Sequence, residues 1–135
     1  MSSLLEMVLR FLLAVALGAG IGYQRERAGK IAGLRTHILV SSGAALFTLV
    51  SIYGFSGAVV DISRVAAGVV VGIGFIGAGV ILRGQREEEV AGLTTAATIW
   101  VTAAIGLAAG AGMYLVSVIA TVVTVGVLFI PKVRG

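Results

Sequence analysis

The chain of 135 residues is 59% hydrophobic and 12% charged, and it carries a formal net charge of +4. A soluble domain has about 25% charged residues, and a domain of this size cannot hide so large an apolar excess from water. The basic residues stand in short gaps between apolar segments rather than on one basic face, so no nucleic-acid partner is expected. The composition therefore predicts an integral membrane protein.

Five apolar stretches are long enough to cross about 30 Å of hydrocarbon, which takes roughly 20 residues of helix. They cover residues 4–23, 36–55, 64–82, 92–109 and 113–131. The short gaps between them make neighbouring helices antiparallel. We therefore expect one all-α transmembrane domain over residues 1–135, with about five helices.

The first apolar stretch contains two charged residues, Glu6 and Arg10. Without them only Phe11–Tyr23 remains, about 20 Å of helix, which is too short to span the bilayer. Arg10 must therefore lie within the helix, where Glu6 is four residues away on the same face and can pair with it. The alternative is a contact of Arg10 into the bundle, with Asp61 or Arg64.

The basic residues also predict the topology, because cytoplasmic loops of membrane proteins are rich in Lys and Arg. Five helices place the loops near residues 24–35 and 83–91 on the same side as the C-terminus. This side then holds eight of the ten basic residues: Arg25, Arg27, Lys30, Arg35, Arg83, Arg86, Lys132 and Arg134. The N-terminus is accordingly expected outside and the C-terminus in the cytoplasm.

The sequence repeats itself with an offset of 59 residues, because residues 18–48 match residues 77–107 without a gap at 10 of 31 positions. Each unit covers two helices, so the repeat is parallel, with helices one and two resembling helices three and four and the fifth standing outside.

Small residues four apart on a helix allow close packing of backbones. The glycines expected to serve this purpose are Gly18, Gly22, Gly68, Gly72, Gly74, Gly77 and Gly79. Their concentration in the third helix predicts that this helix is the centre of the bundle; a pore or a bistable helix is the alternative. An open glycine-rich face also predicts a homodimer or a higher oligomer.

The two cytoplasmic elbows of the repeat are the most polar places beside the membrane. Gly33 and Gly92 are expected to permit tight turns, and Thr36 and Thr95 to cap the helices that follow. His37 is expected to be a satisfied polar group at the helix start, or a pH sensor. Further along, Thr94, Thr98 and Thr102 stand four apart, either bonding back to their own helix or forming a polar stripe in the bundle.

Two charged residues, Asp61 and Arg64, open the third helix on the outer side as a local cap or ion pair, or as a contact for an external cation or partner. No carboxylate falls at mid-membrane depth, and no nucleophile with a base and an orienting group is visible. We expect neither catalysis nor a cofactor, and a magnesium association has no identified ligands. The functional candidates are Arg25, Glu26, Arg35, Thr36, His37, Asp61, Arg64, Thr94, Thr95 and Thr98.

Several of these segments together resemble the MgtC/SapB family of bacterial inner-membrane proteins. They are AGLRTH at 32–37, GAALF at 43–47, Asp61 and Arg64, GIGFIGAG at 72–79 and GLTTAA at 92–97. The resemblance spans about residues 8–130. The chain departs from the family at Gln24, Ile62 and Gly68, where a glutamate, a proline and a glutamine are usual.

The resemblance implies a multi-pass protein of the bacterial inner membrane that supports growth in low magnesium, acid tolerance and survival in host cells by regulating other membrane proteins. We expect a non-enzymatic regulator that binds a membrane partner or senses an ion. The alternative is a small transporter or channel for Mg²⁺ or protons, with its path between the helix repeats. Many members add a C-terminal cytoplasmic domain, so the chain is expected to represent the membrane domain alone, either as a natural form or as part of a longer protein.

Overall fold

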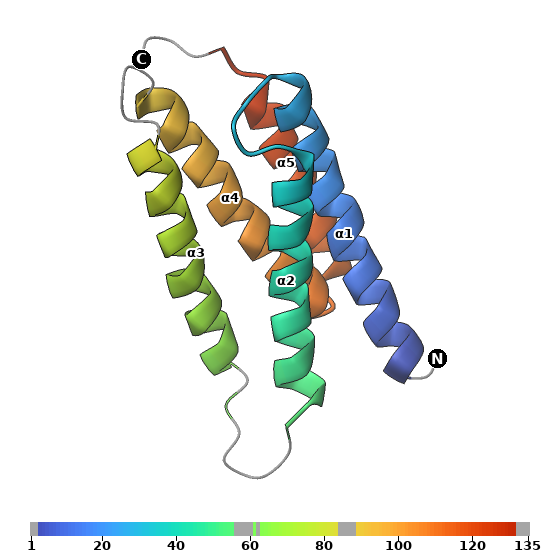
Figure 1. Ribbon diagram of the computed structural model, residues 1–135. Helices are drawn as coiled ribbons and strands as arrows, with labels where there is room; N and C mark the ends of the chain where they lie inside the picture. The colour runs from blue at the N-terminus through green and yellow to red at the C-terminus, as the bar shows by residue number, and fades with distance from the viewer. Residues whose placement is uncertain (1–2, 56–60, 62, 84–88, 132–135) are drawn as a thin grey trace.

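The computed structural model describes residues 3–55, 61, 63–83 and 89–131, without the side chains of residues 82, 83 and 89–91. This part of the chain is helical throughout apart from its turns. Figure 1 shows the five helices: α1 (Ser3–Arg27), α2 (Leu34–Tyr53), α3 (Ser63–Arg83), α4 (Glu89–Gly110) and α5 (Tyr114–Leu128). The prediction of an all-α fold with five helices is confirmed.

Four of the helices are long and apolar enough to cross a membrane: α1, α2, α3 over Ser63–Ile81 and α4 over Gly92–Gly110. Helix α5 is shorter than predicted, because its 15 residues extend only about 22 Å. It ends at Leu128, just before Pro131, which cannot donate a backbone hydrogen bond and disfavours helix at the residue before it.

Helix α1 continues past its predicted end at residue 23, because a Schellman motif closes it only after Arg27. Gly29 adopts a φ of 72°, and its amide donates to the Glu26 carbonyl at 3.1 Å. The Lys30 amide donates to the Arg25 carbonyl, also at 3.1 Å. Only glycine adopts this left-handed conformation without strain. The motif also fixes Lys30 beside the last turn of α1.

The helices alternate in direction, so that α1, α3 and α5 run one way and α2 and α4 the other (Figure 1). The end of α1, the starts of α2 and α4 and the ends of α3 and α5 therefore lie at one end of the bundle, as predicted. We call this the elbow end. Four basic residues used in the topology prediction have side chains that the structure does not describe: Arg83, Arg86, Lys132 and Arg134.

Helix α4, not α3, is the centre of the bundle, because it packs against each of the other four helices. The prediction for α3 is wrong: this helix stands at the edge (Figure 1) and, of the described helices, packs only against α4 and, more sparsely, α2. A Cβ atom added at Gly68, Gly72, Gly74 or Gly79 would meet no atom within 4 Å. Small residues permit close approach but do not enforce it, which is why the glycine count misplaced the centre.

Close backbone contacts instead join α2 to its two neighbours, α1 and α4. A Cβ atom at Gly22 of α1 would lie 2.8 Å from the Leu34 Cα. At Gly106 of α4 it would lie 2.8 Å from the Ser41 Cα, and at Gly110 it would lie 2.8 Å from the Ala45 carbonyl oxygen. These glycines are needed for the space that their missing side chains leave.

The packing of the two hairpins follows the repeat. A Cβ atom at Gly18 would lie 2.7 Å from the carbonyl oxygen of His37, and one at Gly77 would lie 3.5 Å from the Cβ of Ala96. Gly77 and Ala96 are the residues 59 positions after Gly18 and His37. Within each hairpin, α1–α2 and α3–α4, the two helices thus meet at equivalent residues. The second hairpin is packed more loosely.

Candidate functional site

A buried polar cluster joins α1, α2 and α4 near the elbow end. It consists of Arg25, His37, Thr95 and Thr98, whose side chains are 3%, 0%, 2% and 4% exposed. Arg25 Nη2 donates to Thr95 Oγ1 at 2.7 Å, and His37 Nε2 lies 3.3 Å from Thr98 Oγ1. We call these four residues the elbow cluster. The four residues were predicted singly; the structure brings them together.

The hydrogen-bond partners of His37 determine which of its ring nitrogens carries a hydrogen. Its Nδ1 is 2.8 Å from the Gly33 carbonyl oxygen, which can only accept, so Nδ1 carries a hydrogen. Thr98 has one hydroxyl hydrogen and two acceptors for it, the Thr95 carbonyl oxygen at 2.7 Å and a neutral Nε2. When Nε2 is protonated it donates to Thr98, whose hydrogen then stays on Thr95. The site therefore accommodates both charge states of His37 by turning one hydroxyl group.

The threonines of α4 combine both predicted roles. Thr98 bonds back to its own helix and also faces the bundle interior. Thr102 is fully buried, and its hydroxyl oxygen has no hydrogen-bond partner in the described part of the chain. Thr94 is half-buried and lines a pocket together with Arg25. The polar stripe of α4 thus points toward α1 and α2 at the elbow end.

The predicted caps are wrong. Helix α2 begins at Leu34, and its N-cap residue is Gly33, so Thr36 already lies in the first turn. The Leu34 amide is instead satisfied by Glu26 Oε1 at 2.9 Å, a residue of α1. Helix α4 begins at Glu89, so Gly92 lies within the helix rather than in a tight turn, and Thr95 is too deep in α4 to cap it. Sequence alone placed both helix starts two or three residues late.

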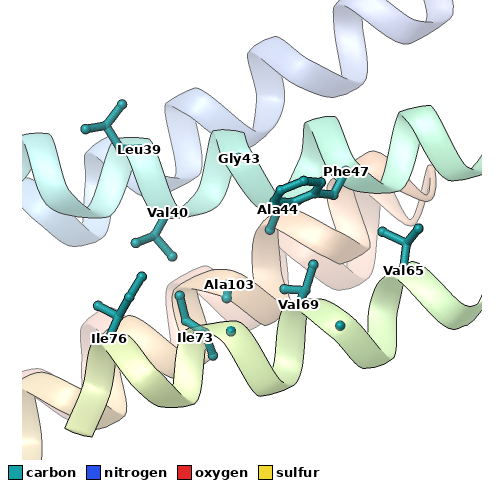
Figure 2. A pocket seen from close by; sticks show the side chains of 12 residues that line it. Leu39, Val40, Gly43, Ala44, Phe47, Val65, Val69, Ile73, Ile76 and Ala103 are labelled. Carbon is teal, nitrogen blue, oxygen red and sulfur yellow. The ribbon is translucent and has the colours of Figure 1, made fainter. Parts of the chain in front are cut away.

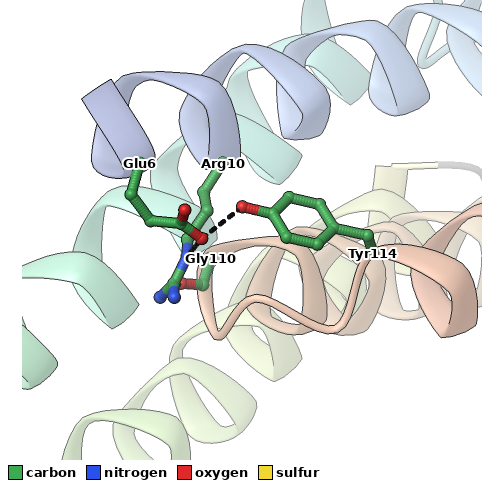
Figure 3. Close-up of polar contacts among 4 residues, drawn as sticks. All are labelled: Glu6, Arg10, Gly110 and Tyr114. Carbon is green, nitrogen blue, oxygen red and sulfur yellow. Dashed lines mark hydrogen bonds and ion pairs between the residues drawn. The ribbon is translucent and has the colours of Figure 1, made fainter. Parts of the chain in front are cut away.

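A second polar cluster closes the opposite end of the bundle and was only partly predicted (Figure 3). Arg10 pairs with Glu6 at 3.1 Å, as expected, and donates to the Gly110 carbonyl oxygen at 3.1 Å. The Tyr114 hydroxyl donates to the same Glu6 carboxylate, and the Arg10 guanidinium lies 5.5 Å from the Tyr53 ring centre. Arg10 thus contacts Gly110 rather than the suggested Asp61 or Arg64.

At the same end, Asp61 forms a local cap for α3. Its Oδ1 accepts hydrogen bonds from the Ser63 amide at 3.1 Å and the Ser63 hydroxyl at 2.8 Å. The Ser63 hydroxyl and amide, together with the charge of Arg64, lower the Asp61 pKa below its ordinary value of 3.8. Both Asp61 and Arg64 are exposed. The described geometry fits the local cap better than a cation site.

An apolar pocket of about 630 Å³ lies between α2 and α3 (Figure 2). Phe47 and Val40 of α2 face Val69 and Ile73 of α3, with Ala103 of α4 at the base (Figure 2). Its remaining lining residues are Leu39, Gly43, Ala44, Val65, Gly68, Gly72 and Ile76. The pocket keeps α3 apart from α2 along the lining residues and offers no polar side chain.

The other candidates lie on the surface of the elbow end. Arg35 and Glu26 are exposed and Thr36 is half-buried. Sequence reasoning missed Ser41, which is fully buried and donates to the Ala14 carbonyl oxygen of α1 at 2.7 Å. A serine seven residues before another small polar residue on α2, Thr48, is a weak signal. Among the described residues, no group of three His, Asp or Glu side chains is placed to hold a metal ion.

Comparison with known proteins places the chain in one family. The model of the MgtC family matches residues 11–133. The chain is 50% identical over 129 residues to the protein named "Putative magnesium transporter YhiD" of Escherichia coli K12, covering 91% of the chain and 59% of that protein. It is 44% identical over 116 residues to the protein MgtC of Salmonella typhimurium LT2, covering 86% of the chain and 48% of that protein.

A third relative is the protein SrpB of Synechococcus elongatus, 44% identical over 125 residues, with 85% of the chain and 69% of that protein covered. No solved structure matches the chain. The chain spans about half to three fifths of the length of YhiD and MgtC. The family match, the four long apolar helices and the resemblance of the elbow segments agree: this chain belongs to the MgtC family and is a multi-pass membrane protein.

Proposed function

We propose that this protein is a non-enzymatic regulator in the bacterial inner membrane, with its N-terminus outside and its elbow end in the cytoplasm. It supports magnesium or acid homeostasis by responding to an ion, here the proton, and by binding another membrane protein. The observation that carries this proposal is the complete burial of His37, with one ring nitrogen against the Gly33 carbonyl and the other against the Thr98 hydroxyl of α4.

The elbow cluster supports a response to protons. Histidine is the side chain whose charge changes most readily between pH 5 and 8. A proton on His37 Nε2 adds a second positive charge near Arg25, in a core where the described partners of both groups are neutral. The repulsion acts between α1, which carries Arg25, and α2, which carries His37. Protonation would therefore bias the packing of these two helices, as a switch requires.

The surface of the elbow end supports binding of a partner. Arg35 is exposed one residue into α2, two residues before His37, so a shift of α2 moves it directly. Charged groups at a membrane boundary remain hydrated and can pair with a partner at little cost. Arg35 is accordingly proposed as a partner contact, with Glu26 and Thr36 beside it.

The runner-up function is transport of Mg²⁺ or protons, and the name of YhiD favours magnesium. The pocket between α2 and α3 lies between the two repeats, where a path was predicted. Its lining is apolar, however, and Mg²⁺ needs oxygen ligands or retained water molecules. The pocket therefore suits an apolar group better than a hydrated cation, and the regulator remains the preferred function.

Purified protein in proteoliposomes separates the two functions. A regulator gives no Mg²⁺ or proton flux when it is the only protein present. Flux that Thr98→Val or Asp61→Ala abolishes would establish transport and overturn the proposal.

The proposed regulatory function is tested in cells that lack the native gene, by measuring growth in low magnesium and at acid pH. We expect His37→Gln and Arg35→Ala to lose the growth benefit while their membrane levels stay normal. Arg27→Ala is the matched control, since Arg27 is exposed at the same end and contacts only Tyr23 among the described residues. Equal loss in all three variants would argue against a specific role of the elbow end.

A further inference from the structure

Arg25 is a buried cation whose charge is not balanced by any described side chain. Its side chain is 3% exposed, and it donates a hydrogen bond from Nη2 to the neutral Thr95 hydroxyl. Its Nε atom has no partner in the described part of the chain, and among the described carboxylates none forms an ion pair with it. A guanidinium out of water is costly unless an anion or several acceptors satisfy it.

Arg25 lines a pocket of about 350 Å³ together with Lys30 and Thr94. The Schellman motif at the end of α1 holds Lys30 here, because its amide is bonded to the Arg25 carbonyl oxygen. The carbonyls of Gly126 and Val127 at the end of α5 already accept from the amides of Phe129 and Ile130. The polar side chains among the residues that line the pocket are thus two cations and a hydroxyl group.

The other wall of the pocket is apolar and belongs to α5 and the residues after it: Val127, Leu128, Ile130 and Pro131. Val127 and Ile130 are also exposed on the outside of the bundle. Tyr23, at the same end, is exposed and accepts a hydrogen bond from Arg27 at 2.9 Å, as a residue at the membrane–water boundary does. The pocket thus has cationic side chains on one side and a lipid-facing apolar surface on the other.

We propose that this pocket binds a negatively charged phosphate group, with Arg25 and Lys30 as its ligands and Thr94 as a hydroxyl donor. Arginine matches phosphate geometry with paired N–H donors, and basic pockets between membrane helices on the cytoplasmic side are sites for anionic lipid headgroups. The apolar wall favours the phosphate of an anionic phospholipid over free phosphate. The inference does not depend on whether the protein regulates or transports.

The test compares the thermal unfolding of the purified full chain in mild detergent with added phosphatidylglycerol or phosphatidylcholine at equal mole fraction. Phosphatidylglycerol should raise the unfolding midpoint by roughly 5 °C more than phosphatidylcholine does. Lys30→Gln should lose at least half of this difference and Arg25→Gln all of it. Lys30 lies in a turn, so its variant carries the test if Arg25→Gln does not fold. Arg27→Gln, which removes a cation outside the pocket, should keep the full difference.

Further measurements interpret the outcome. Millimolar inorganic phosphate that stabilises as strongly as phosphatidylglycerol would show that the pocket takes free phosphate, while no effect assigns it to the lipid. Equal effects of the two lipids, or equal losses in Lys30→Gln and Arg27→Gln, would overturn the proposal. So would a triple variant Glu87→Gln, Glu88→Gln and Glu89→Gln that destabilises the wild type but not Arg25→Gln, because an acidic side chain would then be the partner of Arg25.

Discussion

Arg25 and Thr95 are 70 residues apart in sequence and are joined by a buried hydrogen bond of 2.7 Å, which ties the last turns of α1 to α4. Thr36, the residue equivalent to Thr95 in the first hairpin, is half-buried and accepts no such bond from the residues that the structure describes. The two elbows are therefore alike in sequence but not in environment, and the difference can be measured.

Thr95→Val keeps the shape of the side chain but removes the acceptor for the Arg25 guanidinium. We expect a loss of about 1–3 kcal/mol in the free energy of unfolding, because a buried donor is left unsatisfied. Thr36→Val should change stability little. Denaturant or thermal unfolding of the purified protein in detergent measures both, and similar effects of the two variants would contradict the assigned bond.

Gly106→Ala tests the close contact between α4 and α2. The added Cβ would meet the Ser41 backbone, 2.8 Å from its Cα, so we expect destabilisation of about 1–3 kcal/mol from overpacking. Gly68→Ala on α3, where no atom lies within 4 Å of the added Cβ, should be neutral or stabilise by up to about 1 kcal/mol, because alanine favours helix over glycine. A reversed order of the two variants in thermal unfolding would contradict the close contact between α4 and α2.

The sequence correctly predicted what depends on local composition: five helices, their alternation and the parallel repeat. It also singled out Arg25, His37, Thr95 and Thr98 one by one. It did not predict that they share one cluster, because their meeting depends on the relative rotation of α1, α2 and α4, which hydropathy does not encode. Gly33 and Gly92 show the same limit, since the two matching elbows begin their helices at different places.

The prediction that α3 is the centre of the bundle failed for a related reason. Gly18 and Gly77 occupy equivalent positions and both face the partner helix of their hairpin. Four other glycines of α3 have no atom within 4 Å of an added Cβ: Gly68, Gly72, Gly74 and Gly79. A glycine shows how closely another helix could approach, but only the structure shows whether a helix lies there.

A pH titration should show that Asp61 stays ionised further into acid than an ordinary aspartate. Its hydrogen bonds from Ser63 favour the charged form and hold its pKa below 3.8 in the folded protein. Its contribution to stability is therefore complete above the unfolded-state pKa and disappears as the pH falls through the lower folded-state value. The carboxyl ¹³C shift of Asp61 in micelles measures the midpoint, and Ser63→Ala should move it upward. A wild-type midpoint at or above 3.8 would contradict the cap.

Reporter fusions test the proposed topology. A fluorescent protein joined within residues 24–35 or after residue 135 should be active, and alkaline phosphatase at the same two places inactive, because both lie on the proposed cytoplasmic side. Phosphatase joined before Ser3 should be active. Phosphatase activity at either elbow-end fusion would reverse or break the topology.

The open face of α3 is where we expect two copies of the chain to meet, as the sequence predicts an oligomer. Gly74→Leu adds bulk on the side of α3 that does not line the pocket, where no atom of the same chain lies within 4 Å of a Cβ, so the single bundle should still fold. Cross-linking and light scattering in mild detergent should show weaker association than in the wild type, whereas Leu115→Ala on exposed α5 should not. A wild type that is monomeric at all concentrations would exclude this interface.

The peripheral placement of α3 has a consequence for how the protein comes apart. Because α3 is anchored by few close contacts while α1, α2 and α4 are interlocked through glycines and buried hydrogen bonds, the free energy needed to detach it is lower than that of the other spans. Amide hydrogens of α3 should exchange with deuterium earlier than those of α4. Pulling on a single molecule should likewise extract α3 at a lower force than the α1–α2–α4 unit resists.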